Sequence, residues 1–529
     1  MFREHKTSTP ATLFTGFGQI LGEQKLKRLE DKRSWDNIFR EQVTFAIDER
    51  IFSVLYSQEN GRPSAPIRIL VGMLILKEGF GWSDSELYDE SRFNIRVMNA
   101  LGLSNASDEV PVESTYYEFQ KKLYEYQIKE GRSLIAEASE KTTKTQAEIF
   151  SVNAKWIRMD SKLVGSNIVK STRLQLIISC LQEFYKSLDE DLKRRLRKGD
   201  REILEELVKK KAYQIVYQSS KEQKEEYLKR FGELLSRLEE IYSRRDGFPK
   251  DRNSNGSRIE EDKYLMIKRL YKEQYQKNPD GKIELKSESQ IPSDAIQSPY
   301  DTDAAYRKKG DKKVRGYSIN IVETCNKGEL NLVLGAEVYK ANKSDNEMLE
   351  EGTKQAERIS GKVKRISVDG AYHSPENQKY AKSEGKVIHL SGITGGAGDY
   401  DFEQVDGKLK VKNKETGEEM IAHITKKGHY RIKESNGKRR YFTKEQIESY
   451  RKRKEVEQLP KEIRNVRCNV EASIFQSCFH LKKDKTKYRG HFRHQLWAKC
   501  RMMWINIVRI RNHIVRLYQK KQKAIPAFT

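Results

Sequence analysis

Three acidic residues occupy positions where ligands of a metal ion would have to lie. Asp160 ends the run 152–160, which predicts a short buried strand stopped by a polar residue. Asp369 ends a second such run, 364–369, and Glu471 lies among apolar residues at helical spacing. In a mostly parallel sheet, ligands gather beyond the carboxyl ends of the strands, so two terminal aspartates are well placed to converge. Their oxygens suit a hard cation such as Mg²⁺.

Such a site favours the cleavage and joining of phosphodiesters. The phosphodiester is anionic and its 3′-oxygen is a poor leaving group, and two cations about 3.5 to 4 Å apart neutralise charge at both ends of an in-line attack. We expect Asp160 to bridge two Mg²⁺ or Mn²⁺ ions, and Asp369 and Glu471 to complete their coordination. Taken singly, Asp369 before Gly370 would indicate only a turn, and Glu471 only a surface acid paired with Arg467.

Four motifs surround these acids in a definite order. They are RMDSKLVGS (158–166), SPYDTDA (298–304), SVDGAYHSPEN (367–377) and YRG (488–490). In this order they resemble the DDE transposases of bacterial insertion sequences, and more narrowly the insertion-sequence-four and insertion-sequence-five type. Residues 61–76, followed by 83–87, resemble the helical N-terminal domain of that group.

The resemblance implies an enzyme that binds the terminal inverted repeats of an insertion sequence and catalyses metal-dependent DNA end cleavage and strand transfer. Its partner would be double-stranded DNA, both element ends and target, and the synaptic complex would hold a homodimer. Two alternatives remain open: an RNase H-like DNA nuclease without strand transfer, and an inactive derivative that only binds DNA.

The family carries a signature of Tyr, Arg, Glu and Lys in the helix that bears the glutamate. Arg467 and Glu471 match this signature, whereas Arg464 stands at the Tyr position and Cys478 at the Lys position. A cleavage pathway through DNA hairpins that needs the full signature is therefore in question. The residues expected to contact DNA are Arg464, Arg467, Lys482, Arg489 and Arg493.

Composition agrees with a polyanionic partner. The chain of 529 residues carries 102 Lys and Arg against 77 Asp and Glu, a net charge of +25. Its five cysteines form no CxxC pair, which indicates a reducing compartment and no structural zinc. No run of eighteen apolar residues and no signal peptide is present, so we expect a cytoplasmic, DNA-associated bacterial protein without a membrane partner.

The C-terminal segment is strongly basic. No acid follows Asp484, while apolar residues such as Trp497, Ile507 and Ile514 recur at near-helical spacing. The pattern predicts an amphipathic helix with a basic outer face that binds DNA backbone without reading sequence. The basic residues assigned to it include Lys499, Arg501, Arg509, Arg511, Arg516, Lys520, Lys521 and Lys523.

The fold class that we predict is α/β, with an RNase H-like core. A hairpin (316–323 with 330–338) followed by helix, strand, helix and strand agrees with that plan, although alternation alone would permit other α/β folds. The predicted parts are an N-terminal helical domain for DNA binding or dimerisation (1–150), a DDE catalytic domain (151–167, 296–390 and 459–529), a helical insertion (168–295) and a β-rich insertion (391–458).

Two of these parts allow alternatives. A short glycine turn at Gly79 and Gly81, before the Ser83 capping box, could belong to a helix-turn-helix that presents Arg92 and Arg96 to DNA, or to a bundle that makes dimer contacts. The charged helices of residues 168–295 are expected to form a solvated face, with a DNA-facing arm as the alternative.

Overall fold

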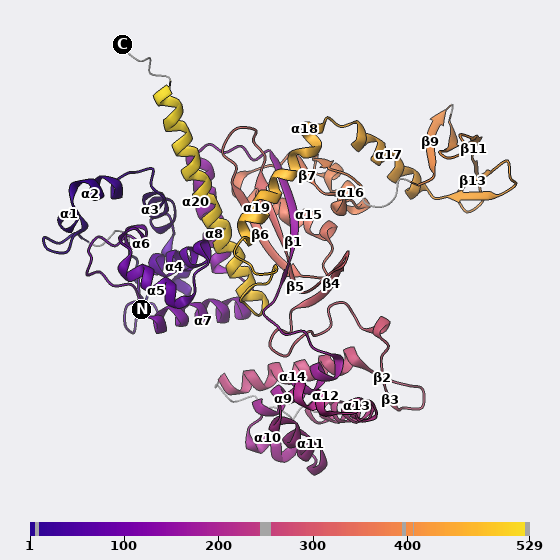
Figure 1. Ribbon diagram of the computed structural model, residues 1–529, viewed down its shortest axis with the longest axis horizontal. Coiled ribbons are helices and arrows are strands. Elements are labelled where there is room, and N and C mark those ends of the chain that lie inside the picture. The colour runs from indigo at the N-terminus through magenta and orange to yellow at the C-terminus, as the bar shows by residue number, and fades with distance from the viewer. Residues whose placement is uncertain (6–9, 244–254, 394–397, 406, 524–529) are drawn as a thin grey trace.

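The computed structural model describes residues 1–5, 10–243, 255–393, 398–405 and 407–523. It is a mixed α/β structure with a central six-stranded sheet and a mostly helical N-terminal region. Figure 1 shows a helical body and a smaller β-rich part lying away from this centre. Within the described residues no helix has both the length and the apolar content that crossing a bilayer requires.

The N-terminal part is helical, as predicted. Its elements are α1 (Phe17–Ile20), α2 (Glu23–Leu29), α3 (Trp35–Phe39), a π-turn (Arg40–Thr44), a 3-10 turn (Glu49–Leu55), α4 (Ile67–Phe80), α5 (Asp84–Phe93), α6 (Ile95–Ala100), α7 (Glu113–Glu130) and α8 (Leu134–Ile149). α4 starts after Pro66 and ends at Gly81, whose φ of 77° is the left-handed conformation that glycine adopts without strain. Ser83 and Glu86 form the predicted capping box of α5.

Two arginines of this part have different surroundings. Arg92 is exposed and lies over the ring of Tyr88. Arg96 donates from Nε and Nη2 to Oδ1 of Asp36, whose side chain is fully buried. Arg96 therefore has a structural partner inside the protein, and the helix-turn-helix and bundle alternatives both stay predictions.

The central sheet has the strand order β4-β5-β1-β7-β8, with β6 also on β5. Its strands are β1 (Trp156–Gly165), β4 (Ala305–Lys309), β5 (Lys312–Thr324), β6 (Val333–Lys340), β7 (Arg365–Val368) and β8 (Val387–Leu390). β5 and β6 form the predicted antiparallel hairpin, and β1 pairs antiparallel with β5 and parallel with β7. Helices α15 (Leu349–Ser360) and α16 (Pro375–Ser383) precede and follow β7, which confirms the predicted alternation.

β1 differs from its prediction. The predicted strand 152–160 ended at Asp160, but the strand continues for five residues to Gly165. The long strand β5 offers pairing partners along this whole stretch, down to Gly316, so the backbone groups beyond Asp160 continue the ladder instead of turning away. Asp160 therefore projects from the middle of a strand, whereas Asp369 directly follows β7 as predicted.

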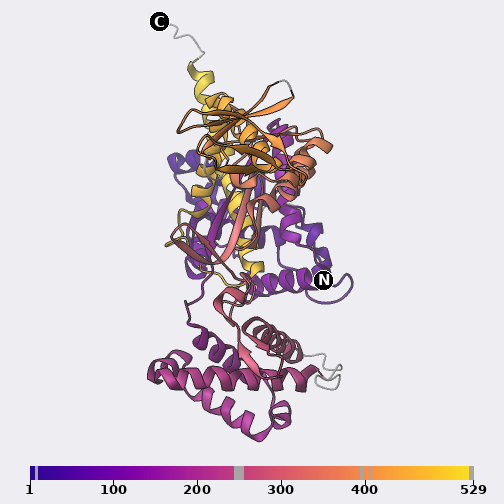
Figure 2. The ribbon, with the colours of Figure 1, turned by 90° about the vertical axis from the view of Figure 1, so that its right-hand side faces the viewer.

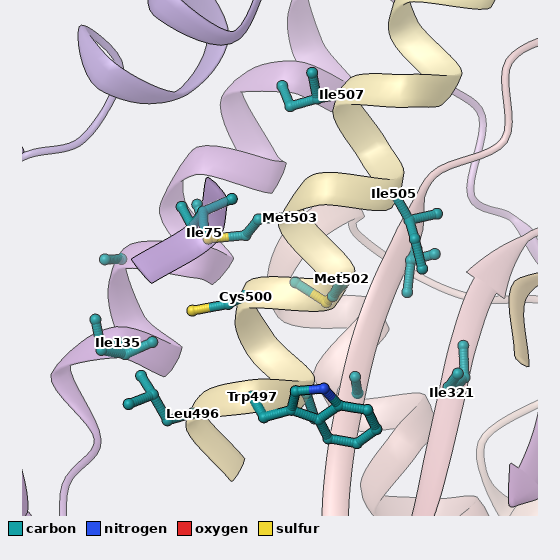
Figure 3. Packing of buried hydrophobic residues seen from close by; sticks show 14 of the residues in the cluster. Ile75, Ile135, Ile321, Leu496, Trp497, Cys500, Met502, Met503, Ile505 and Ile507 are labelled. Carbon is teal, nitrogen blue, oxygen red and sulfur yellow. The ribbon is translucent and has the colours of Figure 1, made fainter. Parts of the chain in front are cut away.

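Helix α20 (His491–Lys523) runs between the N-terminal helices and the sheet (Figure 3). Its first half is buried on two sides. The labelled side chains toward α4 and α8 are Leu496, Cys500 and Met503, and those toward the sheet are Trp497, Met502 and Ile505.

The predicted basic outer face is therefore wrong for this half of α20. Lys499 and Arg501 are each 1% exposed. Lys499 forms an ion pair with Glu337 on β6, and Arg501 donates to the carbonyls of Glu78 and Gly79 at the end of α4, 2.7 Å each. The periodicity identified one apolar face, but packing partners lie on both sides of the helix. Exposed basic residues are restricted to its two ends.

The insertion after β1 folds as a helical body with its own apolar core, which Figure 2 shows at one end of the molecule. It contains α9 (Arg173–Ser187), α10 (Glu190–Arg195), α11 (Lys198–Lys209), α12 (Ala212–Gln218), α13 (Lys221–Ser243), α14 (Asn255–Gln274) and the short strands β2 (Tyr275–Lys277) and β3 (Ile283–Leu285). The long helices predicted for this segment are confirmed, together with shorter ones that the pattern did not separate.

The second insertion contains two three-stranded sheets around a small core. Its strands are β9 (Tyr400–Val405), β10 (Lys408–Asn413), β11 (Glu419–Ile421), β12 (His423–Ile424), β13 (Tyr430–Lys433) and β14 (Arg439–Phe442). The prediction missed β9, and it assigned a β-rich structure up to residue 458. The last part is instead helix α17 (Lys444–Gln458), which Thr443 and Gln446 start with a capping box.

Candidate active site

The three predicted carboxylates come from two neighbouring strands and one helix. Asp160 lies on β1, opposite Ile321 of β5. Asp369 follows β7, the parallel neighbour of β1, and its Oδ1 accepts a hydrogen bond from the Gly370 amide at 2.6 Å. Glu471 lies in the first turn of α19 (Cys468–Cys478), which packs on β1 and β5. The local turn after β7 thus ties the carboxylate of Asp369 to the backbone amide that follows it.

One guanidinium atom lies among the three carboxylates. Nη2 of Arg467 is 2.7 Å from Oδ2 of Asp160, 3.2 Å from Oε1 of Glu471 and 4.0 Å from Oδ2 of Asp369. Since each oxygen is within 4.0 Å of the same atom, any two of them are within twice that distance of each other. The structure therefore brings together the three acids that the sequence singled out, and it adds Arg467 at their centre.

The electrostatics of this group follow from its partial burial. Asp160 is only 8% exposed, and this burial, reinforced by Asp369, raises the pKa of Asp160 against the opposing effect of Arg467. Burial disfavours the charged guanidinium, yet Asp160, Asp369 and Glu471 together outweigh it and raise the pKa of Arg467. Three carboxylates thus converge on a half-buried site where a positive charge stabilises them. The guanidinium of Arg467 provides that charge.

The donor set fits a hard divalent cation. All three acids offer carboxylate oxygens, the ligands that Mg²⁺ and Mn²⁺ prefer. As the side chains lie, however, the described part of the chain holds no group of three or more His, Cys, Asp or Glu residues arranged to bind a metal. The guanidinium of Arg467 occupies the space between the carboxylates instead, so metal binding would require Arg467 to move.

A buried charge network fixes the helix that carries Glu471. Glu323 of β5 is fully buried and accepts from Arg158 of β1, from the hydroxyl of Ser473 on α19 and, at 2.7 Å, from Nη1 of Arg509 on α20. A single carboxylate thereby joins two strands of the sheet to two helices. Each pair is charge-assisted, and the network holds α19 against β1 beside Asp160.

The sequence analysis missed this network. Glu323 directly follows the apolar pair Ile321 and Val322 of a predicted strand, and a charged residue there signals a buried partner of opposite charge. The signal does not identify the partner, because Arg509 lies 186 residues away in the chain.

The predicted DNA contacts divide into two groups. Arg467 lies in the site, and Arg464 ends α18 (Lys461–Arg464), three residues before it. Lys482, Arg489 and Arg493 lie toward the other end of β1.

Specific contacts place this second group. The backbones of Lys482 and Lys485 form an isolated β-bridge, and Lys485 forms a second β-bridge with Gly165 at the end of β1. Nε of Arg489 donates to the carbonyl of Asn167 at 2.7 Å, and Arg493 lines a cleft together with Arg489. At roughly 3.3 Å per strand residue, the Gly165 end of β1 is about 16 Å from Asp160. The structure therefore does not bring these three cations to the carboxylates.

Two models of transposase domains match parts of the chain. Residues 27–122 match the model of a transposase domain (DUF772), and residues 283–503 match the model of the transposase DDE domain. The second match includes Asp369 and Glu471, while Asp160 precedes it. No curated protein and no solved structure matches the chain.

The fold and the two matches define a transposase with a catalytic DDE domain. Residues 27–122 and 283–503 thus match the two domains of a DDE transposase, an N-terminal DUF772 domain and a DDE domain. Proteins of this class act on DNA in transposition, and their DDE domain implies the use of a divalent metal.

Proposed function

We propose that this transposase binds the terminal inverted repeats of an insertion sequence, cuts its ends and joins them to target DNA within a synaptic homodimer. The observation that carries the proposal is the convergence of Asp160, Asp369 and Glu471 on one cation, Arg467. Three carboxylates that surround one positive charge can also surround divalent cations, because these ions prefer oxygen ligands. Asp160, Asp369 and Glu471 would together hold two divalent ions, Mg²⁺ or Mn²⁺.

We further propose an RNase H-like plan for the catalytic domain, comprising residues 151–167, 296–390 and 459–529. Its support is the mixed sheet, in which β1 pairs antiparallel with the hairpin strand β5 and parallel with β7, followed by β8. The helical body (168–295) and the second insertion (391–458) would then interrupt this domain without contributing strands to the sheet.

The chain's own residues would have distinct roles in the reaction. When bound, divalent cations supply charge neutralisation at the attacking and leaving oxygens of the phosphodiester. Asp160, which is buried, holds its carboxylate in a fixed position on a paired strand, and Glu471 is more exposed and can adjust. Arg467, once released from the carboxylates, would donate to a phosphate oxygen of the DNA strand. The Glu323 network keeps α19 in register with β1 during these changes.

The test is a cleavage assay with purified protein, Mn²⁺ and labelled duplexes that carry the element ends. Asp160→Asn and Glu471→Gln should each lower end cleavage by about a thousandfold or more, while the affinity for the duplex stays close to that of the parent protein. Glu462→Gln is the matched control, since Glu462 is an exposed acid on α18 whose surface pair with Lys327 contributes little.

The reaction products distinguish a transposase from a nuclease without strand transfer and from an inactive DNA-binding derivative. Covalent joining of labelled ends to a target plasmid supports a transposase and excludes a nuclease without strand transfer. Duplex binding without any metal-dependent nicking by the parent protein would indicate an inactive DNA-binding derivative. Cleavage that survives in either acid variant would contradict the assigned site.

A further inference from the structure

A cleft of about 880 Å³ lies between the N-terminal helices and the last turns of α20. One wall comes from α2, from the segment before α3 and from the start of α6, and the other from α20. The charged side chains that line it are Lys25, Arg28, Asp31, Arg33, Arg96 and Arg511. We call these residues the basic cleft.

The side chains that line the basic cleft carry a net positive charge. Its only acid, Asp31, is neutralised within the wall, because Arg33 donates to it from Nε at 2.8 Å and from Nη2 at 3.0 Å. The hydrogen bonds from Arg33, together with the more distant charge of Arg511, lower the pKa of Asp31, so this carboxylate stays ionised and paired. The remaining cations leave the cleft with a positive surplus.

Two arginines of the basic cleft are held in place by carboxylates, Arg33 by Asp31 and Arg96 by Asp36. The guanidinium of Arg33 lies over the ring of Tyr518, 4.2 Å from its centroid, and so connects the two walls. Arg96 is held by the buried Asp36, yet half of its side chain remains exposed to the cleft. Ordered guanidinium groups lose less conformational freedom on binding an anion, and their planar fork fits phosphate oxygens.

Further cations lie near the end of α20, outside the lining of the basic cleft. Arg516, Lys520 and Lys521 are exposed, and no acid follows Asp484 in the sequence. From Arg511 to Lys521 the helix rises by about 15 Å. Figure 1 shows this end of α20 reaching beyond the rest of the protein. These cations lie on different faces of the helix, since Arg516 lines a second cleft together with Arg509, whereas Arg511 lines the basic cleft.

The basic cleft is separate from the candidate active site. Arg509 faces Glu323 and Ser473, on the side of α20 toward α19. Arg511 is two residues further, about 200° around the helix, and faces the N-terminal helices. The body of α20 thus stands between the two positive surfaces.

We propose that the basic cleft binds the sugar-phosphate backbone of duplex DNA, at a distance from the strand being cut. The inference rests on the proposed function, since it names a second surface for the same element end. Contacts to phosphates through Lys25, Arg28 and Arg511 would position the duplex without reading its sequence. The bound segment anchors the transposase while the terminal phosphodiester lies at Asp160.

The test compares two charge-reversed variants of the full chain. In the cleft variant, Lys25, Arg28 and Arg511 are each changed to Glu. They are exposed, and among the residues that the structure describes no hydrogen bond or ion pair holds their side chains. The matched control reverses the same number of charges on the separate helical body: Lys198→Glu, Lys221→Glu and Lys229→Glu. Circular dichroism and melting curves show whether both remain folded.

Binding is measured by fluorescence anisotropy, with a labelled duplex of about 30 base pairs in EDTA, between 50 and 200 mM NaCl. The cleft variant should bind about 30-fold more weakly at 100 mM NaCl than the parent. Its slope of log K against log [NaCl] should be shallower by about 2 to 3, near 0.9 for each lost phosphate contact. The control variant should stay within about threefold of the parent.

Each outcome decides the proposal. Equal slopes for the two variants overturn it, and so does a parent that binds no duplex. A cleft variant that changes only the oligomeric state, with the salt slope intact, also overturns it and indicates a protein partner. Failure of the proposed function looks different: the cleft variant would lose affinity as expected, but the parent would show no Mn²⁺-dependent cleavage.

Discussion

Arg467 and Asp160 lie 307 residues apart in the chain, yet Nη2 of Arg467 is 2.7 Å from Oδ2 of Asp160. The same nitrogen is within 4.0 Å of Asp369 and Glu471. The guanidinium thereby occupies a position of positive charge among three carboxylates. We infer that it stabilises the site while no metal is bound.

Replacement of Arg467 by Ala should therefore destabilise the metal-free protein and strengthen its response to metal. Without the guanidinium, the buried Asp160 faces two other carboxylates, and we expect the melting temperature in EDTA to fall by about 3 °C. Added Mn²⁺ should raise the melting temperature of the variant more than that of the parent, because the ion replaces the lost charge. Arg464→Ala is the control, and equal Mn²⁺ responses of Arg467→Ala and the parent would contradict the idea.

Glu323→Gln should loosen the helix that carries Glu471. The substitution keeps the size of the side chain but leaves Arg158 and Arg509 without their buried counter-charge, a loss of about 3 kcal/mol. We expect faster limited proteolysis within residues 459–490 and reduced end cleavage, with duplex binding retained. Glu329→Gln, at an exposed acid in the β5–β6 turn, should leave both properties unchanged. Parent-like proteolysis of Glu323→Gln would show that the network does not hold α19.

Gly79→Ala should destabilise the contact between α4 and α20. A Cβ at position 79 would lie 2.4 Å from Cδ2 of Trp504, so the two helices would have to separate. The better helix propensity of alanine, about 1 kcal/mol, does not offset this clash. Gly199→Ala in α11 is the counterpart, because a Cβ there meets nothing and the melting temperature should rise or stay the same. If Gly79→Ala melts at the same temperature as the parent, the proposed clash with Trp504 is wrong.

Acid should weaken the fold through His494. Burial lowers the pKa of its imidazole to about 4 from an ordinary 6.5, and the neutral ring bonds Gly490 and Thr486 at 2.8 Å each. The unfolded chain takes up the proton first as the pH falls. The stability is thus fully present above pH 6.5 and is lost toward pH 4, by about 3 kcal/mol for this group.

The measurement is the melting temperature between pH 7 and pH 4. His494→Gln should flatten its decline, whereas substitution of the exposed His423 to Gln should leave the curve parallel to that of the parent. A curve of His494→Gln that runs parallel to the parent's would exclude His494 as the main acid-sensitive group.

Local features of the chain were predictable because their causes are local. The hairpin of β5 and β6, the capping box at Ser83, the start of α16 at Ser374 and the position of Asp369 after β7 depend on side-chain periodicity and on capping within a few residues. The order of the motifs also predicted which acids would meet, and the structure places them around one guanidinium.

Contacts between distant segments had no such local cause. The continuation of β1 past Asp160 depends on the length of β5, and the burial of Lys499 and Arg501 depends on α4 and β6 enclosing α20 from two sides. Glu323 gains its partners only when two strands and two helices pack together. Periodicity describes one face of a segment at a time, so it cannot tell how many faces the folded protein will cover. That number follows from packing, which also places Arg467 beside Asp160.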